Sequence, residues 1–473
     1  MKGRLRVLTF IVLALCLAPA AFAQDDATVA ATADRYLSIR TEMGAFSGAA
    51  LIVRNGKIVL RKGYGYADIE KRIAYTPETR HEVASVSKMF TAAAALKLQN
   101  DHKLSVDDAI CRYLDPCPDT WKAIQIKHLI GHTSGIPDYE SKLDLGSDKY
   151  LAFMTRPEAN KQIVEDAKKL PLDFPPGTQF NYSNTGYILL SYIVEKAAGM
   201  PFAKYVEKEL LRPAGMTRSG VIDSQHLPSE LAIGYNHDEL GWPRTLAGVD
   251  LTAIDMKRLP QLSLTSPEGD AFLFSTVDDL YKWSQVMDGA KPNVLSKDDI
   301  RTIVTPNEFS YGFGWFVGKA FGEMRYRHTG ALPGYVTDFI KFPEKGITII
   351  LVSNVPGRVS SAARDLSTLI LGKPYDMPVR GNVVTLAKEQ VTPLEGKYKW
   401  PDGRVLTISN QPDYLTAVLE KQFTAGLIPM SGTYFYFPLG DGTATFKMGA
   451  DGRADSVNIH YSGEDHIAIR IKD

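Results

Sequence analysis

The chain has 473 residues, and its 54 lysines and arginines balance 54 aspartates and glutamates, so the formal net charge is zero. That balance argues against a nucleic-acid-binding protein, because such proteins need a basic surface to displace counterions from phosphates. Hydrophobic residues at 44% and charged residues at 23% exclude a disordered chain, and the length suffices for about three domains.

The first 23 residues are predicted to be a signal peptide. Basic residues precede a short apolar stretch at 7–17, and Ala21-Phe22-Ala23 fits the small-x-small cleavage rule. An N-terminal membrane anchor is disfavoured, because so short a stretch does not cross a bilayer core of about 30 Å. We therefore expect cleavage near Ala23 and a periplasmic or secreted mature chain that spans no membrane.

Turn and hydrophobic patterns next predict alternating strands and helices. A hairpin is expected at 48–60, where two apolar runs flank Asn55-Gly56, the preferred pair for a type I′ turn. The unbroken β-branched run at 347–352 is typical of a central strand with both faces covered. Helices are expected at three places: from Ser85 onward, at 185–198 before Gly199, and at 360–371.

Two cysteines of the predicted mature chain, Cys111 and Cys117, enclose only five residues. An oxidising compartment would let them form a disulfide, although so short a loop stabilises less than a long one. Two free thiols are the alternative, and a nucleophilic cysteine is the weakest interpretation, because nothing nearby would lower its pKa. With no CxxC or HExxH pattern, the sequence offers no obvious zinc ligands, and no metal site is predicted.

The pattern changes after Lys373. Residues 376–390 mix turn-forming and polar residues and are predicted to link one domain at 24–375 to another at 391–473. In the second domain, short alternating runs separated by turn pairs indicate a small antiparallel sheet or barrel. These turn pairs are Asp402-Gly403, Gly440-Asp441-Gly442 and Asp451-Gly452.

The first motif that contains candidate catalytic residues is Ser85-Val86-Ser87-Lys88, an S-x-x-K. A serine hydroxyl is a poor nucleophile until a base takes its proton, and residues three apart share one helix face, so the Lys88 amine can reach Ser85. Ser85 at a helix start would also offer its backbone N–H to an oxyanion. The alternative is that Ser85 only caps the helix, because so short a pattern is weak alone.

The second motif is Tyr182-Ser183-Asn184. Residues two apart in an extended segment point the same way, so Tyr182 and Asn184 could face one groove. There the tyrosine could shuttle a proton and the asparagine could hold a substrate amide. The alternative is that Ser183 or Asn184 merely caps the following helix.

The third motif is His328-Thr329-Gly330, at the end of an expected strand. A strand edge that ends in glycine lets a substrate backbone lie close and bind as an added strand. A lone histidine there is usually only a satisfied polar residue, but the order of the three motifs argues for function.

With these motifs the sequence resembles the serine β-lactamase and penicillin-binding DD-peptidase superfamily, in its class C β-lactamase-like branch. That family carries S-x-x-K, Y-x-N and K-T-G or H-x-G in this order, and the resemblance covers roughly residues 30–370. Surrounding segments extend the likeness: 129–136, 176–184, 213–216, 275–280 and 311–315.

The resemblance implies an α/β fold of the α+β sandwich type: an antiparallel sheet flanked by helices, a helical subdomain, and a small lipocalin-like C-terminal β domain. It implies that Ser85 is the acylated nucleophile, Lys88 its proton acceptor, and Tyr182 a proton relay whose pKa Lys88 lowers. Asn184 and the His328-Thr329-Gly330 triplet would bind substrate, and the N–H groups of Ser85 and Ala331 would form the oxyanion hole. No cofactor is implied.

Some residues depart from the family pattern. His132 belongs to a structural turn, so a Ser-His-Asp triad is disfavoured. His328 stands where β-lactamases typically have lysine, so the site would lack a fixed positive charge that holds a substrate carboxylate. His81 replaces a usual aromatic residue, and Phe272, in a stretch that is normally small and glycine-rich, is expected to narrow the groove.

We therefore expect a secreted serine hydrolase that acts through an acyl-enzyme on amide or ester bonds. A D-Ala-D-Ala carboxypeptidase-like enzyme or a D-amino-acid peptidase or amidase ranks first, and a β-lactamase or promiscuous esterase second. A penicillin-binding sensor without turnover is the alternative from another class. The partner would be a small-molecule or peptide substrate, and the C-terminal domain a lid or an interface; the oligomeric state is left open.

Overall fold

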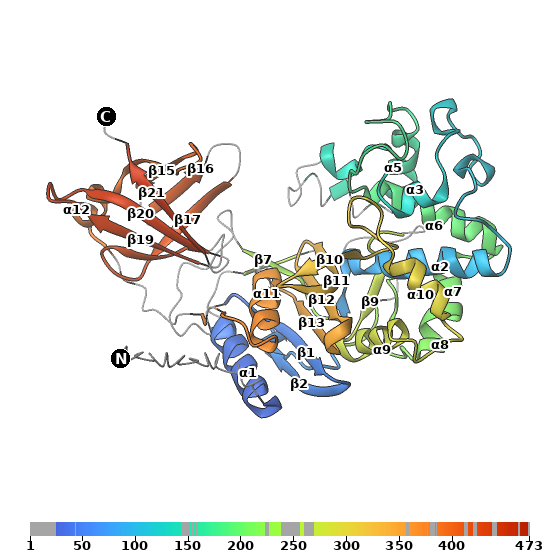
Figure 1. The fold of residues 1–473 in the computed structure, drawn as a ribbon, viewed down its shortest axis with the longest axis horizontal. Helices are drawn as coiled ribbons and strands as arrows, with labels where there is room; N and C mark the ends of the chain where they lie inside the picture. The colour runs from blue at the N-terminus through green and yellow to red at the C-terminus, as the bar shows by residue number, and fades with distance from the viewer. Residues whose placement is uncertain are drawn as a thin grey trace, which may run out of the picture.

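The computed structural model of the protein contains a mixed α/β body and a separate C-terminal β domain (Figure 1). The predicted signal peptide and residues 376, 379–383 and 385 of the predicted linker lie outside the described residues. Within the described part, no helix has both the length and the apolar character needed to cross a bilayer. The described residues are 25–42, 44–142, 149, 152–153, 156, 159–222, 227–237, 256–259, 269–355, 359–375, 377–378, 384, 386–410, 415–419, 423–437, 442–461 and 464–471.

A six-stranded antiparallel sheet forms the centre of the body, in the order β10-β11-β12-β13-β1-β2. The predicted strand at 347–352 is confirmed as β13, an entirely buried strand in the interior of the sheet. The strands are β1 (Gly48–Arg54), β2 (Lys57–Tyr64), β10 (Phe316–Ala320), β11 (Glu323–Leu332), β12 (Tyr335–Phe342) and β13 (Ile347–Ser353).

The predicted hairpin at 48–60 is confirmed as β1 and β2. Asn55 and Gly56 have φ angles of 50° and 76°, the left-handed values that a type I′ turn requires. The side chains of β1 then alternate between two apolar clusters, because successive residues of a strand point to opposite faces. Leu51 joins the cluster on the helical side, and Ile52 joins the cluster under the N-terminal helix.

Helices cover both faces of the sheet. On one face, α1 (Asp26–Glu42) and α11 (Val359–Ile370) pack side by side, as blue and orange helices in Figure 1. On the other lies the helical part of the body: α2 (Lys88–Asn100), α3 (Ile126–Ile130), α5 (Ala159–Ala167), α6 (Asn184–Ala198), α7 (Phe202–Val206), α8 (Arg212–Ala214), α9 (Val277–Met287) and α10 (Lys297–Val304).

The predicted helix at 185–198 is confirmed as α6. Ser183 is its N-cap, and Gly199 ends it with a φ of 66°. The predicted helix at 360–371 is confirmed as α11.

Small sheets and single helical turns complete the body. They are β3 (Tyr66–Asp68), β4 (Ile73–Ala74), β5 (His81–Glu82), β6 (Gly220–Val221), β7 (Tyr235–His237), β8 (Met256–Arg258), β9 (Leu273–Ser275), η1 (Ala84–Ser87), η2 (Ile110–Arg112), η3 (Asp119–Trp121), η4 (Tyr139–Lys142), η5 (Glu207–Leu211) and η7 (Pro343–Lys345).

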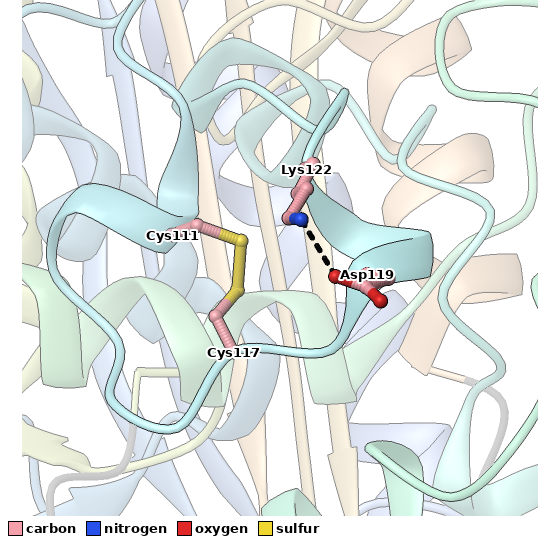
Figure 2. Close-up of a disulfide and its surroundings, with 4 residues drawn as sticks. All are labelled: Cys111, Cys117, Asp119 and Lys122. Atoms are coloured by element: carbon pink, nitrogen blue, oxygen red, sulfur yellow. Dashed lines mark ion pairs between the residues drawn. A yellow bond between two sulfur atoms is a disulfide. The ribbon is translucent and has the colours of Figure 1, made fainter.

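A disulfide joins Cys111 to Cys117, with 5.4 Å between their Cα atoms. It closes a short loop between η2 and η3, as Figure 2 shows, with the Asp119–Lys122 ion pair beside it. The sequence left a disulfide, two free thiols or a nucleophilic cysteine open, and the structure supports the disulfide.

The C-terminal domain is an eight-stranded closed antiparallel barrel, as the turn spacing predicted. Apolar side chains such as Leu406, Phe435 and Phe446 fill its interior, and Thr416 is the one buried polar side chain among the described residues after 390. The barrel comprises β14 (Gly396–Lys399), β15 (Val405–Asn410), β16 (Leu415–Leu419), β17 (Phe423–Pro429), β18 (Tyr434–Phe437), β19 (Gly442–Met448), β20 (Ala454–Tyr461) and β21 (Glu464–Arg470), preceded by α12 (Lys388–Val391) and η8 (Thr392–Leu394).

A small apolar cluster connects the barrel to the body. Ile39 and Ala45, at the C-terminal end of α1, pack with Ile428, Met430 and Tyr436 of the barrel. The barrel therefore contacts the face of the body that carries α1.

Candidate active site

Ser85 lies on η1, a single 3₁₀ turn between β5 and α2. Its side chain is partly exposed, whereas those of Ala84, Val86 and Ser87 are buried. Ala84 has a φ of 50°, a left-handed conformation that is strained for a residue with a side chain. The Ser87 hydroxyl accepts the N–H groups of residues 272 and 273 and anchors the turn to β9. The fold thus holds one serine hydroxyl at the surface of an otherwise buried turn.

The predicted contact between Lys88 and Ser85 is confirmed. The Lys88 Nζ atom lies 3.0 Å from Ser85 Oγ, and the lysine side chain is fully buried. Nζ also donates to the Asn184 amide oxygen at 2.7 Å and to the Asp270 backbone carbonyl at 3.1 Å. Three oxygen acceptors therefore surround the amine, and one of them is the hydroxyl it would deprotonate.

Tyr182 lies directly above this amine. Lys88 Nζ is 5.0 Å from the centroid of the tyrosine ring, and the ring also stacks on His132, with centroids 4.2 Å apart. Lys88 and a hydrogen bond with Ser85 act to lower the pKa of the Tyr182 phenol, but burial outweighs them and the pKa is raised. Lys88 does act to lower this pKa, as predicted, but the net direction is wrong, because the sequence did not reveal how much protein surrounds the partly exposed ring.

His132 supports the tyrosine rather than the nucleophile. Its backbone has a φ of 57°, and its Nδ1 atom accepts the backbone N–H of Ser183 at 3.0 Å. Burial, with Lys88 nearby, lowers its pKa well below the usual value. His132 is thus a neutral ring in a turn, which agrees with its expected structural place.

The third motif lies on β11, with one edge free beside Ser85. In the described part of the chain, β10 pairs with β11 only as far as Arg327, so the edge of residues 328–332 has no strand partner there. A Cβ atom on Gly330 would lie 2.1 Å from the Val83 carbonyl oxygen and 3.1 Å from Ser85 N, so only glycine fits. Gly330 thus brings β11 against the turn that carries Ser85, and the oxyanion hole formed by the N–H groups of Ser85 and Ala331 stays a prediction.

His328 is buried beneath this edge. Its Nδ1 donates to the carbonyl of Thr329 at 2.6 Å, and its Nε2 lies 3.1 Å from the Tyr311 hydroxyl. Burial and the proximity of Lys88 lower its pKa to about 3, so the ring is neutral at physiological pH. The site therefore has no fixed positive charge here, as the sequence indicated. Substrate binding by residues 328–330 stays a prediction.

Three carboxyl groups near Lys88 were missed by the sequence analysis. Asp138 accepts the backbone N–H of Asn184 at 3.2 Å and its side-chain amide at 3.3 Å. Asp270 is buried and Glu140 partly buried, and burial raises the pKa of both carboxyls, that of Glu140 to about 7. Asp138 lies two residues after the segment 129–136, one of those that extend the family likeness. Its position in the sequence does not indicate its contact with α6.

The prediction that Phe272 narrows the groove is wrong. Its side chain is 1% exposed and packs edge-on against Phe202, with ring centroids 4.9 Å apart, inside the main core. Phe272 immediately precedes β9, and its contact with Phe202 places it in the core, so its size bears on packing and not on substrate access.

Comparison with known proteins assigns the family. The family model described as Beta-lactamase matches residues 33–372. Penicillin-binding protein 4* of Bacillus subtilis is 27% identical over 449 residues, which cover 91% of this chain and 96% of that protein. A D-aminopeptidase of Brucella canis is 30% identical over 340 residues, which cover 70% of this chain and 61% of the D-aminopeptidase.

A solved structure extends the likeness to the whole fold. The octameric penicillin-binding protein homologue from Pyrococcus abyssi has a TM-score of 0.62 at 24% identity, and the match covers 91% of this chain and 97% of that chain. The family model spans most of this sequence, and the matched segment contains all three motifs. The chain thus belongs to the beta-lactamase family and is a serine hydrolase related to penicillin-binding proteins and D-aminopeptidases.

Proposed function

We propose that the protein is an exported hydrolase that forms an acyl-enzyme on Ser85 and cleaves amide bonds of D-amino-acid peptides or amides. The observation that carries this proposal is the 3.0 Å contact between the Lys88 amine and the Ser85 hydroxyl beside a free strand edge. The D-aminopeptidase and penicillin-binding relatives support the substrate class.

The proposed reaction begins at the Ser85 hydroxyl. Ser85 Oγ attacks the substrate carbonyl carbon while its proton moves to the neutral Lys88 amine. The carbonyl oxygen becomes an oxyanion, which the N–H groups of Ser85 and Ala331 stabilise. Tyr182 relays this proton from Lys88 to the leaving amine as the C–N bond breaks, so Lys88 and Tyr182 return to their starting states and the acyl group remains as an ester on Ser85. Water then attacks this ester, releasing the acid and the free hydroxyl.

The charges around the groove favour a substrate with an ammonium group over one with a carboxylate. His328 is neutral, and the carboxyls of Asp138, Glu140 and Asp270 interact electrostatically with one another near Lys88. Burial raises the pKa of all three carboxyls, and in their ionised forms they would attract a free amino end and repel a C-terminal carboxylate. Within the proposed class we therefore rank D-amino-acid peptidase or amidase activity above D-Ala-D-Ala carboxypeptidase activity.

A substrate panel tests this ranking. The purified protein would be assayed on a D-amino-acid nitroanilide, a D-Ala-D-Ala peptide, a chromogenic cephalosporin and a nitrophenyl ester. We expect the nitroanilide to have the highest kcat/KM, and the Ser85→Ala variant to lose all four activities. Faster turnover of the cephalosporin would instead support a β-lactamase, and of the ester a promiscuous esterase. A stable β-lactam adduct without turnover of any substrate would support a penicillin sensor.

Export to the periplasm or medium is proposed from the N-terminal pattern, with cleavage near Ala23. The Cys111–Cys117 disulfide supports an oxidising compartment. Cell fractionation and N-terminal sequencing of the mature protein test this part. Recovery of the uncleaved chain in the cytoplasm would contradict it.

A further inference from the structure

A neutral lysine can act as a base on Ser85 only if its lone pair faces the hydroxyl. The amine then keeps two N–H donors, and two acceptors are within reach: the Asn184 amide oxygen at 2.7 Å and the Asp270 carbonyl at 3.1 Å. When both accept, the lone pair is left for Ser85 Oγ. The orientation of the Asn184 amide therefore decides where the base points.

An amide can be rotated by half a turn at little steric cost, because its oxygen and nitrogen are similar in size. If the Asn184 nitrogen faced Lys88, it would donate to the neutral amine. The lone pair would then be engaged by Asn184 and lost to Ser85. Another group must therefore hold the Asn184 amide with its oxygen toward Lys88.

We propose that Asp138 is a positioning residue that locks the Asn184 amide and thereby directs the Lys88 lone pair at Ser85. One carboxylate oxygen accepts the backbone N–H of Asn184 at 3.2 Å, and the other accepts the amide nitrogen at 3.3 Å. Burial raises the pKa of Asp138, and Lys88 and the Asn184 N–H oppose that effect. In its ionised form the carboxylate only accepts hydrogen bonds, so it excludes the flipped amide, which would turn oxygen toward oxygen. This inference rests on the proposed acylation of Ser85.

A purely structural role for Asp138 makes a different prediction. A carboxylate at the N-terminal end of α6 also stabilises that helix, and capping alone would affect unfolding rather than the rate of acylation. The variant Asp138→Asn separates the roles. Its amide oxygen can still accept the backbone N–H of Asn184, but its NH₂ group faces the Asn184 nitrogen and favours the flipped amide.

The test measures acylation of the full-length protein by a fluorescent penicillin, with intact-mass spectrometry and thermal unfolding. For Asp138→Asn we expect acylation roughly 10- to 100-fold slower, with little change in Tm or in noncovalent binding of the probe. Asp173→Asn is the matched control, because Asp173 holds Asn181 at the same 3.3 Å on the exposed loop before Tyr182, and it should acylate normally.

A double-mutant cycle shows whether Asp138 acts through Asn184. In an Asn184→Ala background, followed over hours, Asp138→Asn should change the rate little, because no amide remains to be oriented. Normal acylation of Asp138→Asn, a loss explained by a lower Tm, or equal losses in both backgrounds would overturn the inference alone. Failure of the native protein to acylate at Ser85 would overturn the proposed function and this inference with it.

Discussion

Two lysine side chains are buried among the described residues, Lys88 and Lys341, and each contacts a serine hydroxyl. Lys341 Nζ lies 2.5 Å from Ser284 Oγ and also contacts Thr348 and the Asp288 carboxylate. Ser284 is fully buried, whereas Ser85 is partly exposed beside a free strand edge. A serine and a lysine in contact therefore do not make a catalytic site.

The acceptors around the two amines explain the difference further. The Asp288 carboxylate forms an ion pair with Lys341 and balances its charge. Burial lowers the pKa of Lys341, and Asp288 opposes that effect. Lys88 directly contacts no carboxylate in the described part of the chain, but two neutral carbonyl oxygens and the Ser85 hydroxyl. The Lys341 amine thus faces a carboxylate that can balance its charge, whereas the acceptors of Lys88 suit the proton transfer that we propose.

The largest expected difference between the two serine–lysine pairs appears when each lysine is replaced in turn. Lys88→Met should lower kcat about 10³-fold, because Ser85 loses its base. Lys341→Met should leave kcat nearly unchanged and lower stability by about 1–3 kcal/mol, because it leaves buried hydroxyls without their partner. Steady-state kinetics and urea unfolding check both. Equal losses of kcat would remove the distinction between the two pairs.

A second pair of variants tests the free edge that only Ser85 has. Gly330→Ala should lower kcat roughly 10- to 100-fold, because the new methyl group meets the Val83 carbonyl and shifts η1. Gly318→Ala, on neighbouring β10, places its Cβ in open space and should behave like the native protein. Ester hydrolysis by the two variants provides the measurement, and full activity of Gly330→Ala would contradict the close approach.

A smaller effect is expected from pH. Burial and the neighbouring carboxyls raise the Glu140 pKa from 4.5 to about 7, so the group gains its negative charge as the pH rises through 7. For a D-amino-acid amide with a free ammonium, KM should then fall a few-fold, and Glu140→Gln should flatten this trend. Unchanged pH dependence in the variant would exclude Glu140 from substrate binding.

The same shift predicts a change in stability. The unfolded chain releases this proton near pH 4.5 and the folded chain only near 7, so the folded state loses stability as the pH rises between these values. Glu140→Gln should remove that loss, which thermal unfolding at pH 4.5 and pH 8 would detect.

The smallest effect on activity is expected from the barrel. Phe435→Ala should destabilise the barrel by about 3–5 kcal/mol, because Phe435 is fully buried in an apolar interior. The kcat of the body should change little, since the apolar cluster that joins the two domains lies at and just after the C-terminal end of α1. Calorimetry with parallel kinetics checks this, and a proportional loss of kcat would instead make the barrel part of the site.

The sequence predicted the parts of this structure that local patterns determine. Asn55-Gly56 specified a turn, Gly199 a helix end, and the run at 347–352 a buried strand, because each depends on backbone conformation or strand periodicity. The spacing of Ser85 and Lys88 similarly predicted their contact, since one helical turn brings them together.

The parts that tertiary packing determines were not predicted. Asp138 and Asn184 are 46 residues apart, and no local pattern indicates that the loop after α3 reaches the start of α6. Phe272 was assigned to the groove, although a contact with the distant Phe202 buries it. The pKa of Tyr182 depends on burial by distant residues such as His132. These three features depend on contacts between residues far apart in the sequence, which the spacing of motifs does not reveal.

Intact-mass spectrometry with peptide mapping, after incubation with a β-lactam, tests the central claim most directly. The account predicts one covalent adduct, on the peptide that contains Ser85, and none on a Ser85→Ala variant that unfolds at the native temperature. An adduct on another residue, or substrate turnover that survives this substitution, would contradict it.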